Sequence, residues 1–313
     1  MKRVACVGIL VADVIVEPVN EYPGAGELTH VNSITLHNGG NAMTAAINLT
    51  KLGVPASMVG KVGNDMFGAY LKGILEKDGI DTRGLSVDDK VQTSASVALI
   101  APSGERSFLH CVGANAVFSI NDIDFKVIEE CDLVFVTGTY LLKSFDGDET
   151  VAFLKKCKEM GKTTFLDVCF DATGRWGALL FDAMPYIDYF MPSIDEAVKI
   201  AGKEEPDDIA DVFFSKGVKN VVIKMGSKGS YLRLAGEEQG KFYPALKGIK
   251  AVDTTGAGDS FCSGFLSAMA RDESPEFAIG VANTTGALSV TAKGATTGIR
   301  PYDETLKFKA EHE

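Results

Sequence analysis

The stretch Val252 to Phe261, VDTTGAGDSF, places two glycines directly before an acidic residue at the start of a predicted helix. Gly256 and Gly258 permit backbone angles that a side chain would forbid, and Ala257 keeps the turn small. Successive N–H groups can then converge on an anion. The apolar residues that follow are four apart, as in a closely packed helix whose first N–H groups point at the same anion. The stretch therefore predicts a phosphate-binding turn.

Asp259 is the acidic residue beside this turn. A carboxylate and a phosphate repel each other, so Asp259 is a poor phosphate ligand. A general base fits better, since it would take the proton of an attacking hydroxyl while the turn stabilises charge on the transferring phosphate. The competing interpretation is that Asp259 only complements the helix dipole and the glycines only form a turn. The motif alone leaves both interpretations open.

The composition narrows the class of partner. The 313 residues include 42 acidic and 31 basic ones, a formal charge of -11, which disfavours nucleic acid or an anionic membrane as partner. An anionic nucleotide would then have to be bound by backbone N–H donors, metal ions and a few basic side chains. The six cysteines lack Cys-x-x-Cys spacing, and the N-terminal apolar run is too short for a typical signal peptide. Both observations predict free thiols in a cytoplasmic protein.

Short apolar runs alternate with helical patterns along most of the chain, which indicates a mainly parallel sheet covered by helices. The predicted buried strands are 3–10, 57–60, 133–137, 163–167, 189–191 and 220–224. The predicted helices are 42–52, 66–77, 148–160, 194–201, 207–215, 258–270 and 275–292, with a charged last helix within 301–313.

Two segments interrupt this alternation, residues 13–36 and 93–110. Their alternating polar and apolar residues and turn sequences predict antiparallel ribbons without helices of their own. A ribbon pair too small to fold alone would suit a lid over the active edge of the sheet. Decoration of the sheet edge is the alternative interpretation.

Three further positions are candidate ligand contacts. The turn Gly39-Gly40-Asn41 precedes a helix of small residues and can approach a substrate, although Asn41 can equally be only an N-cap. Asp13 follows a buried strand, where a carboxylate can accept bonds from a polyol or serve a structural turn. Residues 226–229 follow another strand, where they predict either a nucleotide contact or a hairpin turn.

The sequence resembles the ribokinase-like (PfkB) carbohydrate kinase family over nearly its whole length. Residues Gly39 to Ala46 with Leu52-Gly53 and Val62 to Gly68 resemble the N-terminal signature of that family, and Asp253 to Phe261 resembles its C-terminal signature. The resemblance implies a three-layer α/β/α sandwich with a mainly parallel central sheet and a small β-sheet lid. It also implies ATP-dependent phosphorylation of a hydroxyl on a small sugar.

On this basis, residues 1–12, 38–91 and 112–313 form the nucleotide- and substrate-binding core, and residues 13–37 and 92–111 form a discontinuous lid. Lid strands with exposed edges need covering, so a homodimer that pairs lid to lid is expected.

The resemblance also implies roles for individual residues. Asp259 matches the catalytic base, and Gly256, Ala257 and Gly258 match the anion hole. The implied sugar contacts are Asp13, Gly39, Gly40, Asn41, Arg106 and Asn115. The implied nucleotide contacts are Lys224, Gly226, Gly229, Thr254, Asn283 and Gly294. Glu196 would hold Mg²⁺ through water. A monovalent cation such as K⁺ could be held by Asp253, Thr255, Ser289, Gly294 and Gly298.

Two positions depart from the family pattern. Thr44 and Ser193 each stand where the family usually has Asn, and the shorter Ser193 alters the expected geometry beside Glu196. A nucleoside kinase on the same scaffold and a sugar-binding regulator without catalysis remain the alternatives. A dinucleotide oxidoreductase fits less well, because the Gly-x-Gly-Asp run lies near the C-terminus and no N-terminal Rossmann motif is present.

Overall fold

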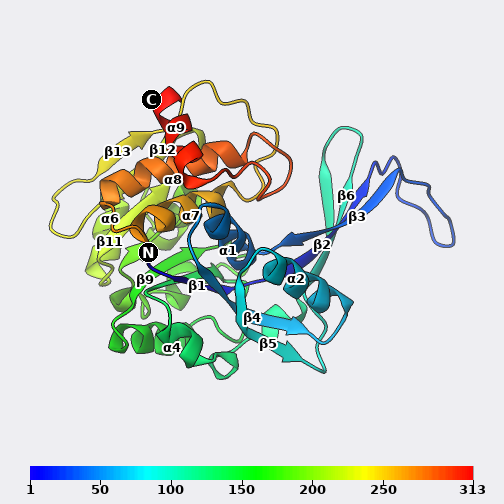
Figure 1. Cartoon of the computed structure of the whole chain (residues 1–313), viewed down its shortest axis with the longest axis horizontal. Helices are drawn as coiled ribbons and strands as arrows, with labels where there is room; N and C mark the ends of the chain where they lie inside the picture. The colour runs from blue at the N-terminus through cyan, green and yellow to red at the C-terminus, as the bar shows by residue number, and fades with distance from the viewer. Residues whose placement is uncertain (313) are drawn as a thin grey trace.

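The computed structural model describes residues 1–312, and a nine-stranded sheet forms their centre (Figure 1). Its strands lie in the order β13-β12-β11-β10-β9-β8-β1-β4-β5. In chain order they are β1 (Val4–Gly8), β4 (Ala56–Gly63), β5 (Asp81–Asp88), β8 (Leu133–Thr139), β9 (Thr163–Val168), β10 (Tyr189–Phe190), β11 (Asn220–Lys224), β12 (Gly229–Arg233) and β13 (Lys241–Pro244). All neighbouring pairs are parallel except β11–β12 and β12–β13. The predicted mainly parallel sheet is confirmed.

Helices cover both faces of this sheet. They are α1 (Asn41–Lys51), α2 (Met66–Lys77), α3 (Phe125–Glu129), α4 (Asp148–Glu159), α5 (Ile194–Ala201), α6 (Pro206–Ser215), α7 (Ala257–Met269), α8 (Pro275–Ser289) and α9 (Tyr302–His312). One apolar core lies under α1, α2, α7 and α8, and a second lies under α3 to α6. This is the expected three-layer sandwich. No helix within residues 1–312 is long and apolar enough to span a membrane.

A second, four-stranded sheet extends from the core as an arm (Figure 1). We call it the small sheet, and its order is β3-β2-β6-β7. Its strands are β2 (Val11–Glu17), β3 (Ser33–Gly39), β6 (Ala95–Ile100) and β7 (Arg106–Cys111). The pairs β2–β3 and β6–β7 are antiparallel, as the sequence predicts for the two ribbons, and a parallel pairing of β2 with β6 joins them.

Polar bonds fix the small sheet to the core where its strands leave it. The Asp65 carboxylate caps α2 at Gly68 N and also accepts bonds from the backbone N–H and hydroxyl of Thr93, just before β6. On the other side, the buried Asn115 amide donates to Leu10 O and accepts from Leu10 N, just before β2. These bonds set the direction of the arm.

The strands and helices predicted from the sequence do not include β5, β12, β13 or α3, although a hairpin turn at residues 226–229, one of the two alternatives, implies β12. Strands β5 and β13 lie at the two edges of the large sheet, so each has only one neighbour and keeps polar, exposed positions. Their sequences therefore lack the continuous apolar run that marks a buried parallel strand. Helix α3 has only five residues, too few for a helical period to show.

Candidate active site

The predicted phosphate-binding turn lies at the start of α7. Gly256 is the N-cap of this helix and has φ of 72°, and a side chain there would overlap Ala295. Glycine is therefore required at Gly256 for both its backbone angle and its packing. Ala257 and Gly258 are the first two residues of α7, so their N–H groups belong to the turn whose amides have no partner within the helix.

Asp259 follows in the first turn of α7 and is 8% exposed. The Asn41 side-chain amide donates a hydrogen bond to Asp259 Oδ1 at 2.7 Å. Burial raises the pKa of Asp259 to about 7, and the nearby charges of Asp167 and Glu196 add to the rise, whereas Asn41 and Lys224 oppose it. A carboxylate with a pKa near neutrality can both accept and release a proton at physiological pH.

A buried ion pair lies beneath this turn. Lys224, the last residue of β11, contacts Asp167 in β9, with 2.6 Å between Lys224 Nζ and Asp167 Oδ1. The Lys224 ammonium also lies 3.6 Å from the point where a Cβ of Gly258 would stand, so it sits below the N-terminus of α7. Burial lowers the pKa of Lys224, but Asp167 and Glu196 outweigh this effect and keep the lysine charged.

Sequence reasoning missed Asp167 as a member of the site. The signal was present, because Asp167 ends an apolar predicted strand, and the carboxyl ends of parallel strands are where open α/β sheets bind ligands. Cys262, one turn after Asp259, is the other missed neighbour, with its Sγ 3.6 Å from Asp167 Oδ2. Nothing in the sequence pattern distinguished this cysteine from the other apolar positions of α7.

Asp13 and the Gly39-Gly40 turn lie against each other where the small sheet joins the core. Asp13 in β2 is in register with His37 of β3 and with Ser96 of β6. A side chain on Gly39 would overlap the Asp13 carboxylate, so glycine at this position leaves room for the acid. Burial raises the pKa of Asp13, although Ser96 and the two neighbouring histidines, His110 and His37, counteract it.

Gly40, not Asn41, is the N-cap of α1, and Asn41 makes no capping bond. The interpretation of Asn41 as only an N-cap is therefore wrong, because its side chain instead joins α1 to Asp259 and accepts a bond from Cys169 Sγ at 3.4 Å.

Substituting Gly40 by alanine tests how much the backbone conformation of the Gly39–Asn41 turn contributes to stability. Gly40 has φ of 89°, and an added Cβ would lie 2.5 Å from Ile9 O. We expect Gly40→Ala to lower the free energy of unfolding by about 2 kcal/mol or more, because strain and overlap add. The matched control is Gly73→Ala in the interior of α2, where an added Cβ meets no atom within 4 Å. Helix propensity predicts a gain of about 0.5–1 kcal/mol there. Urea unfolding of both variants measures the difference, and equal shifts would contradict the expectation.

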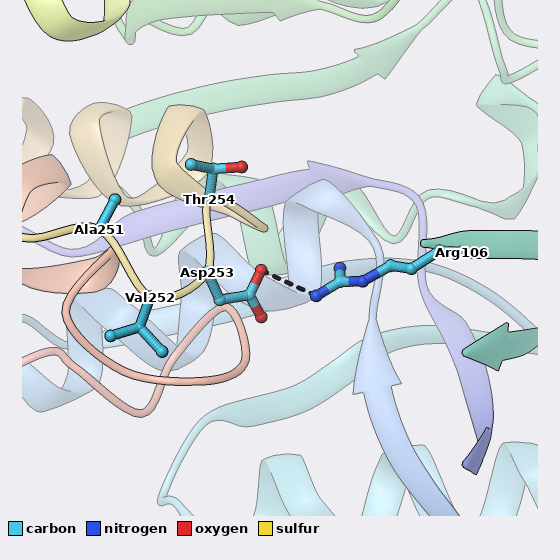
Figure 2. A pocket seen from close by; sticks show the side chains of 5 residues that line it. All are labelled: Arg106, Ala251, Val252, Asp253 and Thr254. Carbon is cyan, nitrogen blue, oxygen red and sulfur yellow. Dashed lines mark hydrogen bonds and ion pairs between the residues drawn. The ribbon is translucent and has the colours of Figure 1, made fainter. Parts of the chain in front are cut away.

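Arg106 reaches from the small sheet to the loop before α7 (Figure 2). Its Nη1 donates to Thr255 Oγ1 at 2.7 Å, and its Nη2 lies 3.1 Å from Asp253 Oδ1. Backbone N–H donors from Gly294 and Thr255, the Thr255 hydroxyl and the Arg106 charge lower the pKa of Asp253 to about 2 against the opposing effect of burial. The guanidinium and residues 251–254 line an open cavity of about 510 Å³.

The residues with an implied nucleotide role lie in two groups. Gly229 in β12 and Asn283 in α8 both lie beside the end of β13. A side chain on Gly229 would overlap Tyr243 O, and the Asn283 amide donates to that same carbonyl at 3.3 Å. Gly226 begins the short turn between β11 and β12. Thr254 O accepts from Ala257 N at 3.2 Å, and Gly294 N donates to Asp253 Oδ2 at 3.0 Å. Their contacts with a nucleotide stay predictions.

Glu196 forms a capping box with Ser193 at the start of α5. Ser193 N donates to Glu196 Oε2 at 2.8 Å, and burial raises the pKa of Glu196, with the charge of Asp167 adding to the rise. The serine therefore has a structural use at the position where the family has Asn. Thr44, the other departure, is buried in α1.

The remaining residues of the implied cation set lie near the end of α8. The Ser289 hydroxyl donates to Gly286 O at 2.8 Å, and a side chain on Gly298 would overlap Leu288 O. Within residues 1–312, no three histidine, cysteine or acidic side chains gather in a way that could hold a metal ion.

Comparisons with known proteins identify sequences similar to this chain. The sequence model described as pfkB family carbohydrate kinase matches residues 1–301. A ribokinase of Haemophilus influenzae is 26% identical over 98% of this chain and 98% of that protein. A 2-dehydro-3-deoxygluconokinase of Bacillus subtilis is 27% identical over 92% of this chain and 90% of its own length.

Solved structures show the same fold. A ribokinase of Arabidopsis thaliana complexed with ribose and ATP has a TM-score of 0.84, with 24% identity and 98% of each chain covered. A structure from Escherichia coli in complex with ATP and Mg²⁺ has a TM-score of 0.83, with 23% identity and 100% of each chain covered.

Proposed function

The chain belongs to the pfkB family of carbohydrate kinases, and on that premise we propose that it transfers the γ-phosphate of ATP to a hydroxyl of a small sugar. The acceptor is a ketose, an aldose or a keto-sugar acid. The observation that carries the proposal is the buried Asp259 carboxylate in the first turn of α7, oriented by Asn41 and flanked by Lys224. An acid so placed is suited to take a proton beside an anion-binding turn.

In this mechanism the sugar lies between Asp13 and the Gly39–Asn41 turn. One hydroxyl points at Asp259, which accepts its proton as the oxygen attacks the γ-phosphorus of ATP, and the bond from that phosphorus to the β–γ bridging oxygen breaks to release ADP. The N–H groups of residues 256–258 stabilise the charge that spreads over the phosphoryl oxygens, and the Lys224 ammonium lies below them. Positioning and charge stabilisation are what a protein contributes most to such a transfer.

ATP and Mg²⁺ are the cosubstrate and metal of this proposal. The solved relatives that hold ATP, and in one case Mg²⁺, support it. Mg²⁺ prefers carboxylate, water and phosphate oxygens, and Glu196 is the acid available to it through water. When bound, the ion neutralises charge on the nucleotide phosphates.

We also propose that the small sheet acts as a lid and as a dimer surface. Its residues Ile34 and Leu109 lie on one face of the sheet by their register and are both more than half exposed, which is unusual for large apolar side chains. A second copy of the chain would cover them.

The pKa of Asp259 predicts the pH dependence of the reaction. A general base must be ionised, and the ionised fraction of Asp259 falls as pH drops through about 7. We therefore expect kcat/KM for the sugar to be constant above that pH and to fall about tenfold per pH unit below it. A pH–rate profile at saturating MgATP measures this, and a profile flat through the mildly acidic range would contradict the assignment.

A coupled ADP-release assay across ketoses, aldoses, keto-sugar acids and nucleosides tests the function itself. Saturable ADP release with one sugar class supports the proposal and names the acceptor. Release with nucleosides alone would replace the proposal with a nucleoside kinase. Sugar binding in calorimetry without ADP release from any compound would indicate a non-catalytic regulator.

A further inference from the structure

Asp253 and Thr255 stand where the family resemblance implies a monovalent cation, but a protein cation already contacts both. Arg106 Nη2 lies 3.1 Å from Asp253 Oδ1 (Figure 2). Arg106 Nη1 donates to Thr255 Oγ1 at 2.7 Å. The Asp253 side chain is only 9% exposed, while that of Arg106 is 39% exposed. A nearly buried carboxylate needs a compensating charge, and the guanidinium supplies it.

Both Asp253 oxygens are also occupied by other donors. Oδ1 accepts from the backbone N–H of Thr255 at 3.0 Å and from its hydroxyl at 2.7 Å, and Oδ2 accepts from Gly294 N at 3.0 Å. With Arg106 in place, Asp253 Oδ1 accepts three bonds, and the positive guanidinium beside it repels a second cation. The implied cation set therefore does not fit a monovalent cation while the small sheet holds this position.

We propose that Arg106 is the fixed cation of this site, taking the place of a monovalent metal ion and linking the small sheet to the anion-binding turn. The proposal rests on the proposed kinase function for its catalytic consequence. Arg106 acts through Asp253 and Thr255, so it is a positioning residue.

The residues that Arg106 contacts lie directly beside the anion-binding turn in the sequence. Thr255 directly precedes the N-cap Gly256, and Thr254 O accepts from Ala257 N at 3.2 Å. A displacement of Thr255 thus moves the first N–H groups of α7. Because Arg106 begins β7, a movement of the small sheet would carry the guanidinium away from Asp253 and loosen this loop.

Removing the guanidinium should convert the site into a true ion site. The cavity of about 510 Å³ beside Arg106 opens to residues 251–254, so a small cation can reach Asp253 from solvent. In Arg106→Gln the carboxylate keeps only neutral donors, and a cation from solution would then be attracted to it.

The experiment compares the wild type with Arg106→Gln in buffer whose only monovalent cation is tetramethylammonium, and then with added K⁺. We expect the wild-type rate to be unaffected by K⁺. We expect kcat/KM of Arg106→Gln to fall about tenfold, which is the effect of losing one hydrogen bond to a charged group. Added K⁺ should restore most of the lost kcat/KM. Arg106→Lys keeps a charge and should need less K⁺. The matched control, Arg83→Gln, removes an exposed arginine paired with Asp81 and Glu130 and should behave as the wild type.

A second measurement does not depend on activity. Thermal unfolding of the unliganded proteins should show that K⁺ stabilises Arg106→Gln but not the wild type, since an ion that binds only the folded state raises its stability. K⁺ activation or stabilisation of the wild type would overturn the proposal. So would an Arg106→Gln protein that responds to K⁺ in neither measurement. If no sugar is phosphorylated by any variant, the kinase proposal fails, and the unfolding experiment still tests the ion site.

Discussion

Replacing Asp259 with asparagine is expected to lower kcat by about 10²–10⁴-fold, the usual contribution of a general base. Asparagine keeps the size of the side chain and an oxygen that can accept the Asn41 bond, but it cannot take a proton. The dissociation constants of ATP and sugar should therefore change little. Steady-state kinetics and calorimetry separate the two effects, and near-normal turnover would remove Asp259 from the role of base.

The same substitution should stabilise the protein at mildly alkaline pH. The folded state holds the Asp259 proton more tightly than the unfolded chain does, so this group favours folding at low pH and loses that contribution as pH rises through about 7. Above that pH the ionised carboxylate is buried at a cost that asparagine avoids. We expect a higher melting temperature for Asp259→Asn at about pH 8 than for the wild type, with a smaller gain at about pH 5.

An exposed acid provides the control for both measurements. Asp303 also lies in the first turn of a helix, α9, but its side chain faces solvent. Asp303→Asn should leave turnover unchanged and should change the melting temperature little, because an exposed side chain away from the core contributes little to stability. If it lowered kcat as much as Asp259→Asn does, the loss would reflect a general effect of charge.

What could be predicted from the sequence is local. The turn at Gly256 follows from its glycines, and the buried strands follow from continuous apolar runs such as Leu133 to Thr137. These features depend on backbone angles and on burial of consecutive residues, which neighbouring positions specify. The fold class follows from their alternation along the chain.

The contacts that build the site are not local. Asn41 and Asp259 are separated by 218 positions, and Arg106 and Asp253 by 147. Such pairs meet only because α1 packs beside α7 and because Arg106, at the start of β7, reaches the loop before α7. The family resemblance implies a sugar contact for Arg106, and nothing near Arg106 in the chain indicates its bond to Asp253. The parallel pairing of β2 with β6 escaped prediction for the same reason.

Lys224 and Asp167 give the second large expected effect, this time on stability. The Asp167 side chain is 2% exposed and that of Lys224 is 12% exposed. Replacing Lys224 with methionine preserves its length but leaves the Asp167 carboxylate without a compensating charge. We expect Lys224→Met to lower the free energy of unfolding by about 3–5 kcal/mol, the range found when one partner of a buried pair is removed.

The double variant Asp167→Asn with Lys224→Met separates the cost of the unpaired charge from that of lost packing. Without either charge, most of the stability should return, because the desolvation of both ions is then avoided. Catalysis should not return with it, since the ammonium below Gly258 is still missing. The exposed pair Lys2–Asp272 is the control, and Lys2→Met should cost at most about 1 kcal/mol. Chemical denaturation measures all three. A double variant as unstable as Lys224→Met would mean that packing of the lysine stem, and not its charge, stabilises the carboxyl ends of β9 and β11.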